Sequence, residues 1–255
     1  MAAFAPRECV ASNLRTVRVI RPFRYGLCAV VVLLVSCANL LAQDEATPRL
    51  QASHRTNIGA AIADSIRLLA IEHGTRIAFQ EKTRRELSGP FFKDYVRSIR
   101  WPKQWEDTDP WWVNYIGHPI HGAAAGLIWI DHGAQGDVPL GDKRYWSSRG
   151  RATAYAAIYS LQFEIGPFSE ASIGNVGMRP ETTGWVDHVV TPAGAFAVLI
   201  VEDALDRYFI RWLERHVTNS TVRGIVRVLF SPARTMANTA QRKTPWHRAD
   251  RPLRP

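Results

Sequence analysis

The sequence contains no cysteine beyond residue 42, because its three cysteines are Cys9, Cys28 and Cys37. A chain that starts after residue 42 therefore has no thiol for a disulfide, a cysteine-ligated zinc, an iron–sulfur cluster or nucleophilic attack. The sequence also lacks the Gly-x-Ser-x-Gly elbow of serine hydrolases, a phosphate-binding loop and a dinucleotide-binding fingerprint. Any chemistry in this protein must then come from histidines and carboxylates.

Alternating polar and apolar runs, which indicate strands, are also scarce. Apolar residues such as Ile58, Ile62 and Ile66 instead recur at helical spacing along 58–87, and Ser88-Gly89-Pro90 ends that segment. The opposite face of this segment is basic, so we expect its apolar stripe to pack inward. Further helices are expected at 113–131, 150–165, 191–215 and 221–229. The sequence predicts an all-α fold, a helical bundle whose apolar helices are broken and studded with polar residues.

The 255 residues are long enough for one good core, and we expect one helical domain over 58–230. The first 42 residues resemble a signal peptide, with a basic segment before an apolar run from Leu27 to Ala42. That run is short for a membrane span, which needs about 20 residues. We therefore expect the chain to be exported and the signal peptide to be cleaved after Ala42. Residues 43–57 then form a polar spacer. Two alternatives stay open: an uncleaved anchor, and lipidation of Cys37 in the lipoprotein-like box Leu34-Val35-Ser36-Cys37.

The net charge of +9 is partly a property of the signal region, because five arginines and one glutamate lie there. Much of the remaining excess lies in a basic Pro/Arg-rich tail over 231–255, which has six Lys or Arg and the single acid Asp250. We expect a solvated tail that can contact anionic lipid headgroups. For an exported chain we predict a membrane surface or envelope lipid as partner and no nucleic acid. The sequence predicts no particular protein partner.

Polar residues interrupt the most apolar segments of the chain. Ionisable groups are costly to bury unless they are paired, hydrogen-bonded or bound to a metal, so we expect an organised polar interior. The residues are Asn114, His118, His121, Glu164, Glu170, Asp187, His188 and Glu202.

The motif His118-Pro119-Ile120-His121 is the clearest member of this set. Proline suits the first helical position, which places His118 near the N-cap and His121 in the first turn, on the same side. Neutral imidazole, which binds metals or acts as a base, is favoured at a helix N-terminus. Two histidines are too few for a zinc site, so a carboxylate would have to come from elsewhere. Capping or core histidines are the alternative interpretation.

Thr191-Pro192 repeats this arrangement, with Thr191 as the expected cap and Asp187 and His188 just upstream. Glu202 falls on the packing stripe of the helix that follows, where a carboxylate needs a partner.

Glu164 lies on a small-residue helix face, Glu170 follows in the next turn, and Arg151 is the candidate counter-charge. Carboxylates on two helices with a histidine on a third resemble the metal sites of helical bundles, although the Glu-x-x-His spacing of di-iron proteins is absent. A divalent metal held by His118, His121 and Glu164 is one hypothesis, and a structural polar network is the other. No other cofactor is predicted.

The part of the chain from Trp105 to Glu202 resembles DUF3943, a family of bacterial envelope proteins. The motifs that carry the resemblance are an acidic stretch with Asn and His-Pro-x-x-Gly, a helix with Glu and a Ser-containing turn, and Asp-x-x-x-Thr-x-x-Gly before a Glu-bearing helix. The resemblance implies a helical, membrane-associated envelope protein and no established activity. The matching residues are Asp107, Asp109, Asn114, His118, Pro119, Gly122, Glu164, Glu170, Ser172, Asp187, Thr191, Gly194 and Glu202.

Three functional hypotheses follow. The first is an exported cell-envelope protein, periplasmic or membrane-associated, whose buried His/Glu/Asp network fixes the bundle and which binds a lipid or an envelope partner. The second is a hydrolase acting on lipid or cell-wall material, metal-dependent or acid–base. The third is a membrane scaffold that uses its Trp-rich connectors and basic tail. Candidate catalytic residues are His118, His121, Glu164, Asp187 and Glu202, and candidate binding residues are Asn114, Arg151, Glu170, His188 and Thr191.

Overall fold

The structure is a computed structural model in which helices account for most of the described residues. The predicted signal region, Cys37 and nearly all of the predicted spacer lie outside those residues. Within the described part there is no strand, only an isolated bridge between Gln104 and Gly184. The all-α prediction is therefore confirmed. The described residues are 55–79, 83–84, 87, 95–96, 104–107, 109–174 and 184–253.

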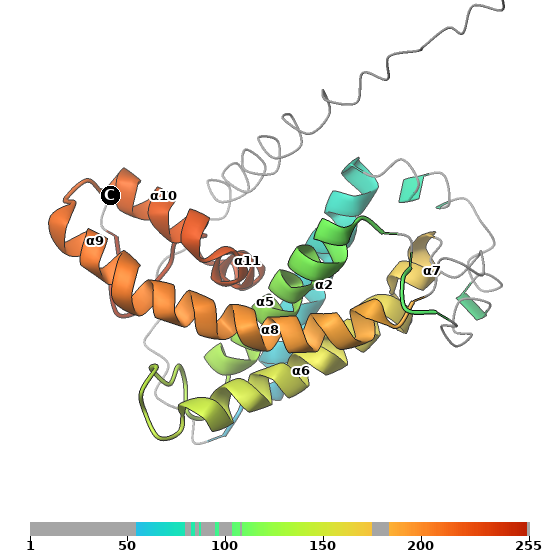
Figure 1. Ribbon diagram of the computed structural model, residues 1–255, viewed down its shortest axis with the longest axis horizontal. Coiled ribbons are helices and arrows are strands. Elements are labelled where there is room, and N and C mark those ends of the chain that lie inside the picture. The colour runs from blue at the N-terminus through green and yellow to red at the C-terminus, as the bar shows by residue number, and fades with distance from the viewer. Residues whose placement is uncertain are drawn as a thin grey trace, which may run out of the picture.

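Most expected helices are present, several of them longer than the sequence indicated (Figure 1). Short π-helical turns, η1 and η3, precede α5 and join α8 to α9. The sequence predicted broken helices, whereas η3 joins α8 and α9 into one continuous helix. The elements are α2 (Ile58–Phe79), η1 (Val113–Gly117), α5 (His118–Asp131), α6 (Tyr145–Ile165), α7 (Glu170–Gly174), α8 (Val186–Ala204), η3 (Leu205–Ile210), α9 (Arg211–His216), α10 (Ser220–Phe230) and α11 (Pro232–Ala240).

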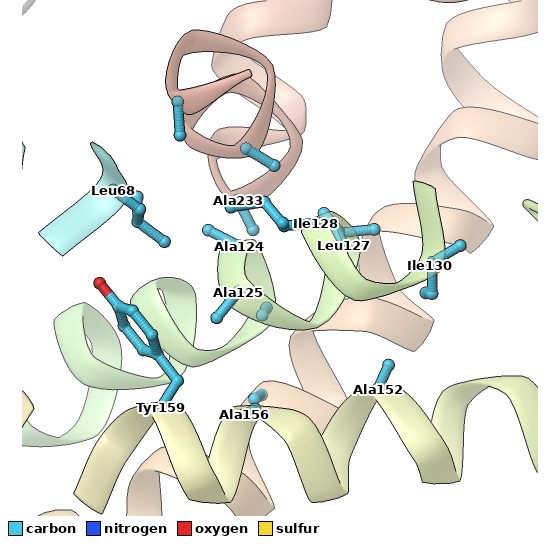
Figure 2. Close-up of a cluster of buried hydrophobic side chains, with 14 of the residues drawn as sticks. Leu68, Ala124, Ala125, Leu127, Ile128, Ile130, Ala152, Ala156, Tyr159 and Ala233 are labelled. Atoms are coloured by element: carbon cyan, nitrogen blue, oxygen red, sulfur yellow. The ribbon is translucent and has the colours of Figure 1, made fainter. Parts of the chain in front are cut away.

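Helix α5 is the centre of the bundle, in contact with α2, α6, α8 and α11. Its alanines face alanines of α6 and α11, so the helices approach closely around a core of small side chains (Figure 2). The contact with α8 is closer still, because a Cβ at Gly194 would lie 2.5 Å from Cγ of Pro119. This close packing fixes the first turn of α5, which carries His118, against α8.

Helix α8 begins earlier than expected. Thr191 does not cap a helix that opens at Pro192, since the helix already starts at Val186 and Pro192 lies inside it. The backbone N–H groups of Trp185 and Val186 donate to the carbonyls of Gln104 and Trp105, at 3.0 and 2.9 Å. Partners supplied from outside the helix thus replace a side-chain cap, and Asp187 enters the first turn.

The buried side of α2 differs in part from the prediction. Of the expected stripe, Leu69 is buried, but Ile58, Ile62 and Ile66 are exposed, and the buried side includes Asp64 and Glu72. Polar partners on the rest of the bundle accompany these buried acids. Asp64 contacts His132 at 2.6 Å, Ser65 contacts Tyr155 at 2.9 Å, and Tyr159 donates to Glu72 at 2.6 Å. The buried side of α2 thus combines core side chains, Leu68 and Leu69, with polar groups that have partners elsewhere in the bundle.

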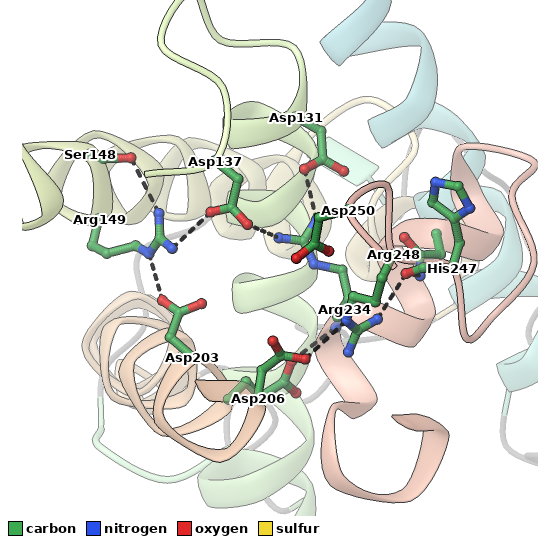
Figure 3. A network of polar contacts seen from close by, with 12 residues as sticks. Asp131, Asp137, Ser148, Arg149, Asp203, Asp206, Arg234, His247, Arg248 and Asp250 are labelled. Carbon is green, nitrogen blue, oxygen red and sulfur yellow. Dashed lines mark hydrogen bonds and ion pairs between the residues drawn. The ribbon is translucent and has the colours of Figure 1, made fainter. Parts of the chain in front are cut away.

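The expected solvated tail is wrong for the described residues 231–253. Helix α11 is largely buried, and the segment after it packs on α10. Acids neutralise most of its basic residues: Arg234 pairs with Asp131 at 2.7 Å, and Arg248 pairs with Asp206 at 3.2 Å (Figure 3). The folded bundle therefore continues beyond residue 230.

Among the described residues, one helix is long and apolar enough to cross a membrane by length and composition: the continuous helix from Val186 to His216. Core helices of soluble proteins share these properties, so length and composition do not by themselves place it in a bilayer.

Candidate metal centre

Three helices bring His118, Glu164 and Asp187 together at one end of the bundle. His118 opens α5, Glu164 lies in the last turn of α6, and Asp187 lies in the first turn of α8. Nδ1 of His118 is 3.6 Å from Oε1 of Glu164, and its Nε2 is 3.9 Å from Oδ1 of Asp187. One donor atom from each residue lies within 4.8 Å of the others, and all three are buried. This triad could hold a metal ion.

The carboxylate oxygens that face His118 have no hydrogen-bond partner. Oε1 of Glu164 and Oδ1 of Asp187 are buried, and neither accepts a hydrogen bond from any described residue. Buried oxygens without partners are costly, and each calls for an explanation. Ligand atoms that lie about 2.0–2.2 Å from a zinc-like cation stand roughly 3–4 Å from one another. The two contacts of His118 use different ring nitrogens, and one donor atom from each residue lies within 4.8 Å of the others. The donors of this triad therefore fit a cation in chemistry, and they would have to move slightly closer together to bind it.

Asp187 is linked to a second carboxylate, Asp107. Oδ1 of Asp107 accepts hydrogen bonds from Nδ2 of Asn114 at 2.7 Å and from the backbone N–H of Asp109 at 3.0 Å. Asp107 also accepts a hydrogen bond from the protonated carboxyl of Asp187. Gly184 permits this arrangement, because a Cβ there would lie 2.5 Å from the carbonyl oxygen of Trp105. The acidic segment before η1 therefore supports the triad directly.

Protonation of the triad reflects its burial. Burial raises the pKa of Glu164 to about 8, against the opposing charge of Arg76. Burial, the charge of Glu164 and the hydrogen bond to Asp107 raise the pKa of Asp187 to about 10. Burial, followed by the neighbouring His121, lowers the pKa of His118 to about 3. Near neutral pH the centre then holds protonated acids beside a neutral imidazole, and a cation would replace those protons.

His121 belongs to a second His–carboxylate pair next to the triad. Its Nδ1 is 3.6 Å from Oε1 of Glu72, whose other oxygen accepts from the Tyr159 hydroxyl at 2.6 Å. The rings of His121 and His118 are 5.9 Å apart, and the Phe163 ring packs edge-on against both. The His121 side chain is 32% exposed, whereas His118, Glu164, Asp187 and Glu72 are buried. The cluster formed by the triad and the His121–Glu72 pair is therefore accessible to solvent at His121.

The counter-charge of this region is Arg76 of α2, whereas Arg151, expected as a counter-charge elsewhere in the bundle, forms no ion pair with a described residue. Arg76 forms an ion pair with Glu170, at the start of α7, and its charge also acts on Glu164. Arg151 is exposed and donates to Gln135 at 2.6 Å. Thirteen residues of α6 separate Arg151 from Glu164, about 20 Å along the helix. The buried arginine of that helix is Arg149, between Asp137 and Asp203 (Figure 3).

Glu202 does not join the triad. Fifteen residues of α8 separate it from Asp187, about 22 Å along the helix axis. Its two oxygens instead accept hydrogen bonds from the backbone N–H groups of Ala233 and Arg234, at 2.7 and 3.0 Å. Glu202 thus caps the N-terminus of α11 from another helix, so its partner is backbone and the prediction that it contributes to the common site is wrong.

The remaining candidates lie beside the centre. Asn114 is fully buried and positions Asp107. Thr191 is buried against α5, with Oγ1 accepting and donating no hydrogen bond among the described residues. His188 is half-buried next to the Trp185 ring, on a different side of α8 from Asp187.

Glu72, Arg76 and Tyr159 were not predicted from the sequence. Their signal was present in part: Asp64, Ser65, Glu72 and His73 share one helical face of α2. All four are buried, and a polar face of this kind would have indicated a second inward-facing set of ligands.

No family model, curated protein or solved structure matches the chain. The resemblance to the DUF3943 family therefore stays a prediction.

Proposed function

We propose that the protein binds a divalent cation between His118, Glu164 and Asp187. The observation that carries the proposal is the pair of buried carboxylate oxygens without hydrogen bonds, which face the imidazole from two different helices. A purely structural network would satisfy those oxygens with hydrogen-bond donors. Here Asn114 and a backbone N–H donate to Asp107, Tyr159 donates to one oxygen of Glu72, and the oxygens of Glu164 and Asp187 that face His118 are left for a cation.

The donor set indicates which ions to expect. One imidazole nitrogen with two carboxylate oxygens is a mixed nitrogen–oxygen site, which suits Zn²⁺, Mn²⁺ or Fe²⁺ better than a site of oxygens alone. Asp107 and Asn114 then act as outer partners that orient Asp187.

A metal-dependent hydrolase is the second candidate function, and His121 is the observation that favours it. A cation with three protein ligands keeps a position for water, and it lowers the pKa of that water. Oε1 of Glu72 lies 3.6 Å from Nδ1 of His121, without a hydrogen bond between them, and the partly exposed ring is the group that would act as general base toward an incoming substrate. An envelope lipid or a cell-wall polymer is the substrate class that we propose. Export to the cell envelope, predicted by the first 42 residues, is part of this proposal.

The first experiment measures metal content. Purified full-length protein is loaded with Zn²⁺ or Mn²⁺, dialysed and analysed by mass spectrometry of the metal. We expect about one equivalent in the wild type and a loss in His118→Ala, Glu164→Gln and Asp187→Asn. Asp142→Asn is the matched control, because this carboxylate pairs only with Arg144 in an exposed loop. Circular dichroism verifies that each variant is folded. Less than about a tenth of an equivalent in the folded wild type would reject the proposal.

A further inference from the structure

Helices α9 and α10 present apolar side chains to the outside. On α10 the residues Ile225 and Leu229 are 53% and 63% exposed, and Val222 and Phe230 are exposed beside them. Trp212 of α9 is 49% exposed, and Tyr208 of η3 is more so. We call these six residues the α9–α10 patch.

The inward side of the same helices is charged. Arg227 of α10 is almost completely buried and donates to Oε1 of Glu214 at 2.6 Å and to the carbonyls of Trp246 and Arg251 at 3.0 and 2.9 Å. Glu214 of α9 also accepts from Arg251 at 2.6 Å. A surface helix in water turns its apolar stripe toward the core. Here the ion pairs occupy the inside, so the outward apolar side is a fixed property of the fold.

The two parts of the patch are joined through η3. The rings of Phe209 and Phe230 are 4.8 Å apart in an edge-to-face contact, and they join η3 to the end of α10. Helix α10 packs against η3, which continues into α9. Clustered apolar surface of this kind marks a contact with another molecule or a membrane.

A row of arginines borders the patch. Arg207, Arg211 and Arg215 recur every four residues along η3 and α9, next to Tyr208 and Trp212, and all three are exposed. Arg211 pairs at the surface with Asp250, which is itself 52% exposed, and Arg207 donates to the carbonyl of Leu140. Aromatic and aliphatic side chains beside arginines are typical of helices that lie in the interface of an anionic bilayer. A second copy of the chain would bring two such cationic rows together at a symmetric contact, which electrostatic repulsion disfavours.

We propose that the α9–α10 patch inserts into the surface of a bilayer containing anionic lipids. Its apolar side chains lie below the headgroups, and the three arginines lie level with the phosphates. The basic tail that the sequence suggested for this contact is instead paired with acids inside the fold. This inference is independent of the metal centre.

The test places a reporter on the patch in the full-length chain. Cys9, Cys28 and Cys37 are replaced by serine, and Ile225→Cys is labelled with a fluorophore that is sensitive to polarity. Ile158→Cys is the matched control, an isoleucine 65% exposed on α6. Both proteins are incorporated into vesicles of phosphatidylcholine and phosphatidylglycerol in a 7:3 ratio, about 30% anionic lipid. Because both variants carry the same N-terminal region, any anchor there affects them equally.

We expect spin-labelled lipid to quench the fluorophore at position 225 at least about twofold more than the fluorophore at position 158. The difference should shrink in vesicles of phosphatidylcholine alone, because the arginines then lose their anionic partners. Equal quenching at both positions would overturn the proposal. The unlabelled Ile225→Cys protein is also tested for disulfide cross-linking between two copies. Cross-linking, together with an absence of lipid quenching in the labelled protein, would overturn the proposal and assign the patch to self-association.

Discussion

Oε1 of Glu164 lies 3.6 Å from Nδ1 of His118, where the last turn of α6 meets the first turn of α5. The residue before Glu164, Phe163, packs its ring edge-on against the same imidazole, with centroids 5.8 Å apart. Successive residues of α6 thus supply a carboxylate and an apolar wall. Low polarity around the pair strengthens every electrostatic interaction within it, including attraction for a cation.

Asn114 is a positioning residue for this centre. Asn114→Ala removes the amide that donates to Asp107, so Asp107 holds Asp187 less firmly. We expect the affinity for Zn²⁺ to fall about 10–100-fold, as for other outer-sphere partners. Isothermal titration calorimetry measures the change, and circular dichroism confirms the fold. An unchanged dissociation constant in a folded variant would show that Asp107 does not act on the metal.

The close packing of α5 on α8 can be tested with two glycines. In Gly194→Ala the new methyl would meet Cγ of Pro119 at 2.5 Å, so we expect a destabilisation of about 1–3 kcal/mol. The control is Gly150→Ala in α6, where nothing lies within 4 Å of the new methyl. Alanine favours the helix there, and we expect stabilisation of about 0.5–1 kcal/mol. Denaturant unfolding measures both, and opposite signs are the expected result.

Glu202 gives the stability a defined pH dependence. Burial raises its pKa from 4.5 to about 7, although the N–H groups of Ala233 and Arg234 oppose the shift. The folded state therefore binds this proton more tightly than the unfolded state. The contribution to stability is fully present below pH 4.5 and is lost as the pH rises to about 7, by roughly 3 kcal/mol.

The measurement compares unfolding free energies of the wild type and Glu202→Gln from pH 4 to 8. The difference between the two proteins isolates Glu202 from the other buried acids, which titrate in both. A difference that does not change with pH would contradict the raised pKa.

Arg227 holds the C-terminal segment to the bundle. Arg227→Met removes a buried cation that binds Glu214 and two backbone carbonyls, and we expect a loss of about 3–5 kcal/mol. Arg215→Met, on the exposed side of α9, should change stability by no more than about 0.5 kcal/mol. Thermal unfolding measures the stability, and faster proteolysis within 241–253 should accompany the loss. Equal stability of the two variants would show that the network does not hold the segment.

Much of the fold was predictable because helical periodicity is a local property. The segments around α5, α8 and α10 were identified from the spacing of their apolar residues, and the Pro119 signal places the start of α5 correctly. The predicted start of helix α8 was too late, because the first N–H groups of the helix donate to a segment that is distant in sequence. Such partners leave no local signal.

The candidate site was predicted in part for a similar reason. His118, Glu164 and Asp187 were singled out as ionisable groups in apolar segments, and the structure brings them together. Glu202 met the same criterion, but its partner is the backbone of α11, which no side-chain pattern reveals. Glu72 was missed because the isoleucines of α2 were expected to face inward.

The exposed isoleucines of α2 also affect how this chain behaves in aqueous solution. Ile58, Ile62 and Ile66 remain on the outside after folding, while the acids of the same helix are enclosed. Folding in water therefore gains little hydrophobic free energy from these isoleucines, because they stay exposed. Two copies of the chain would bury them by associating through these surfaces. Detergent or lipid added during purification would cover them, so the yield of monodisperse protein should depend on the amphiphile more than on the salt or the buffer.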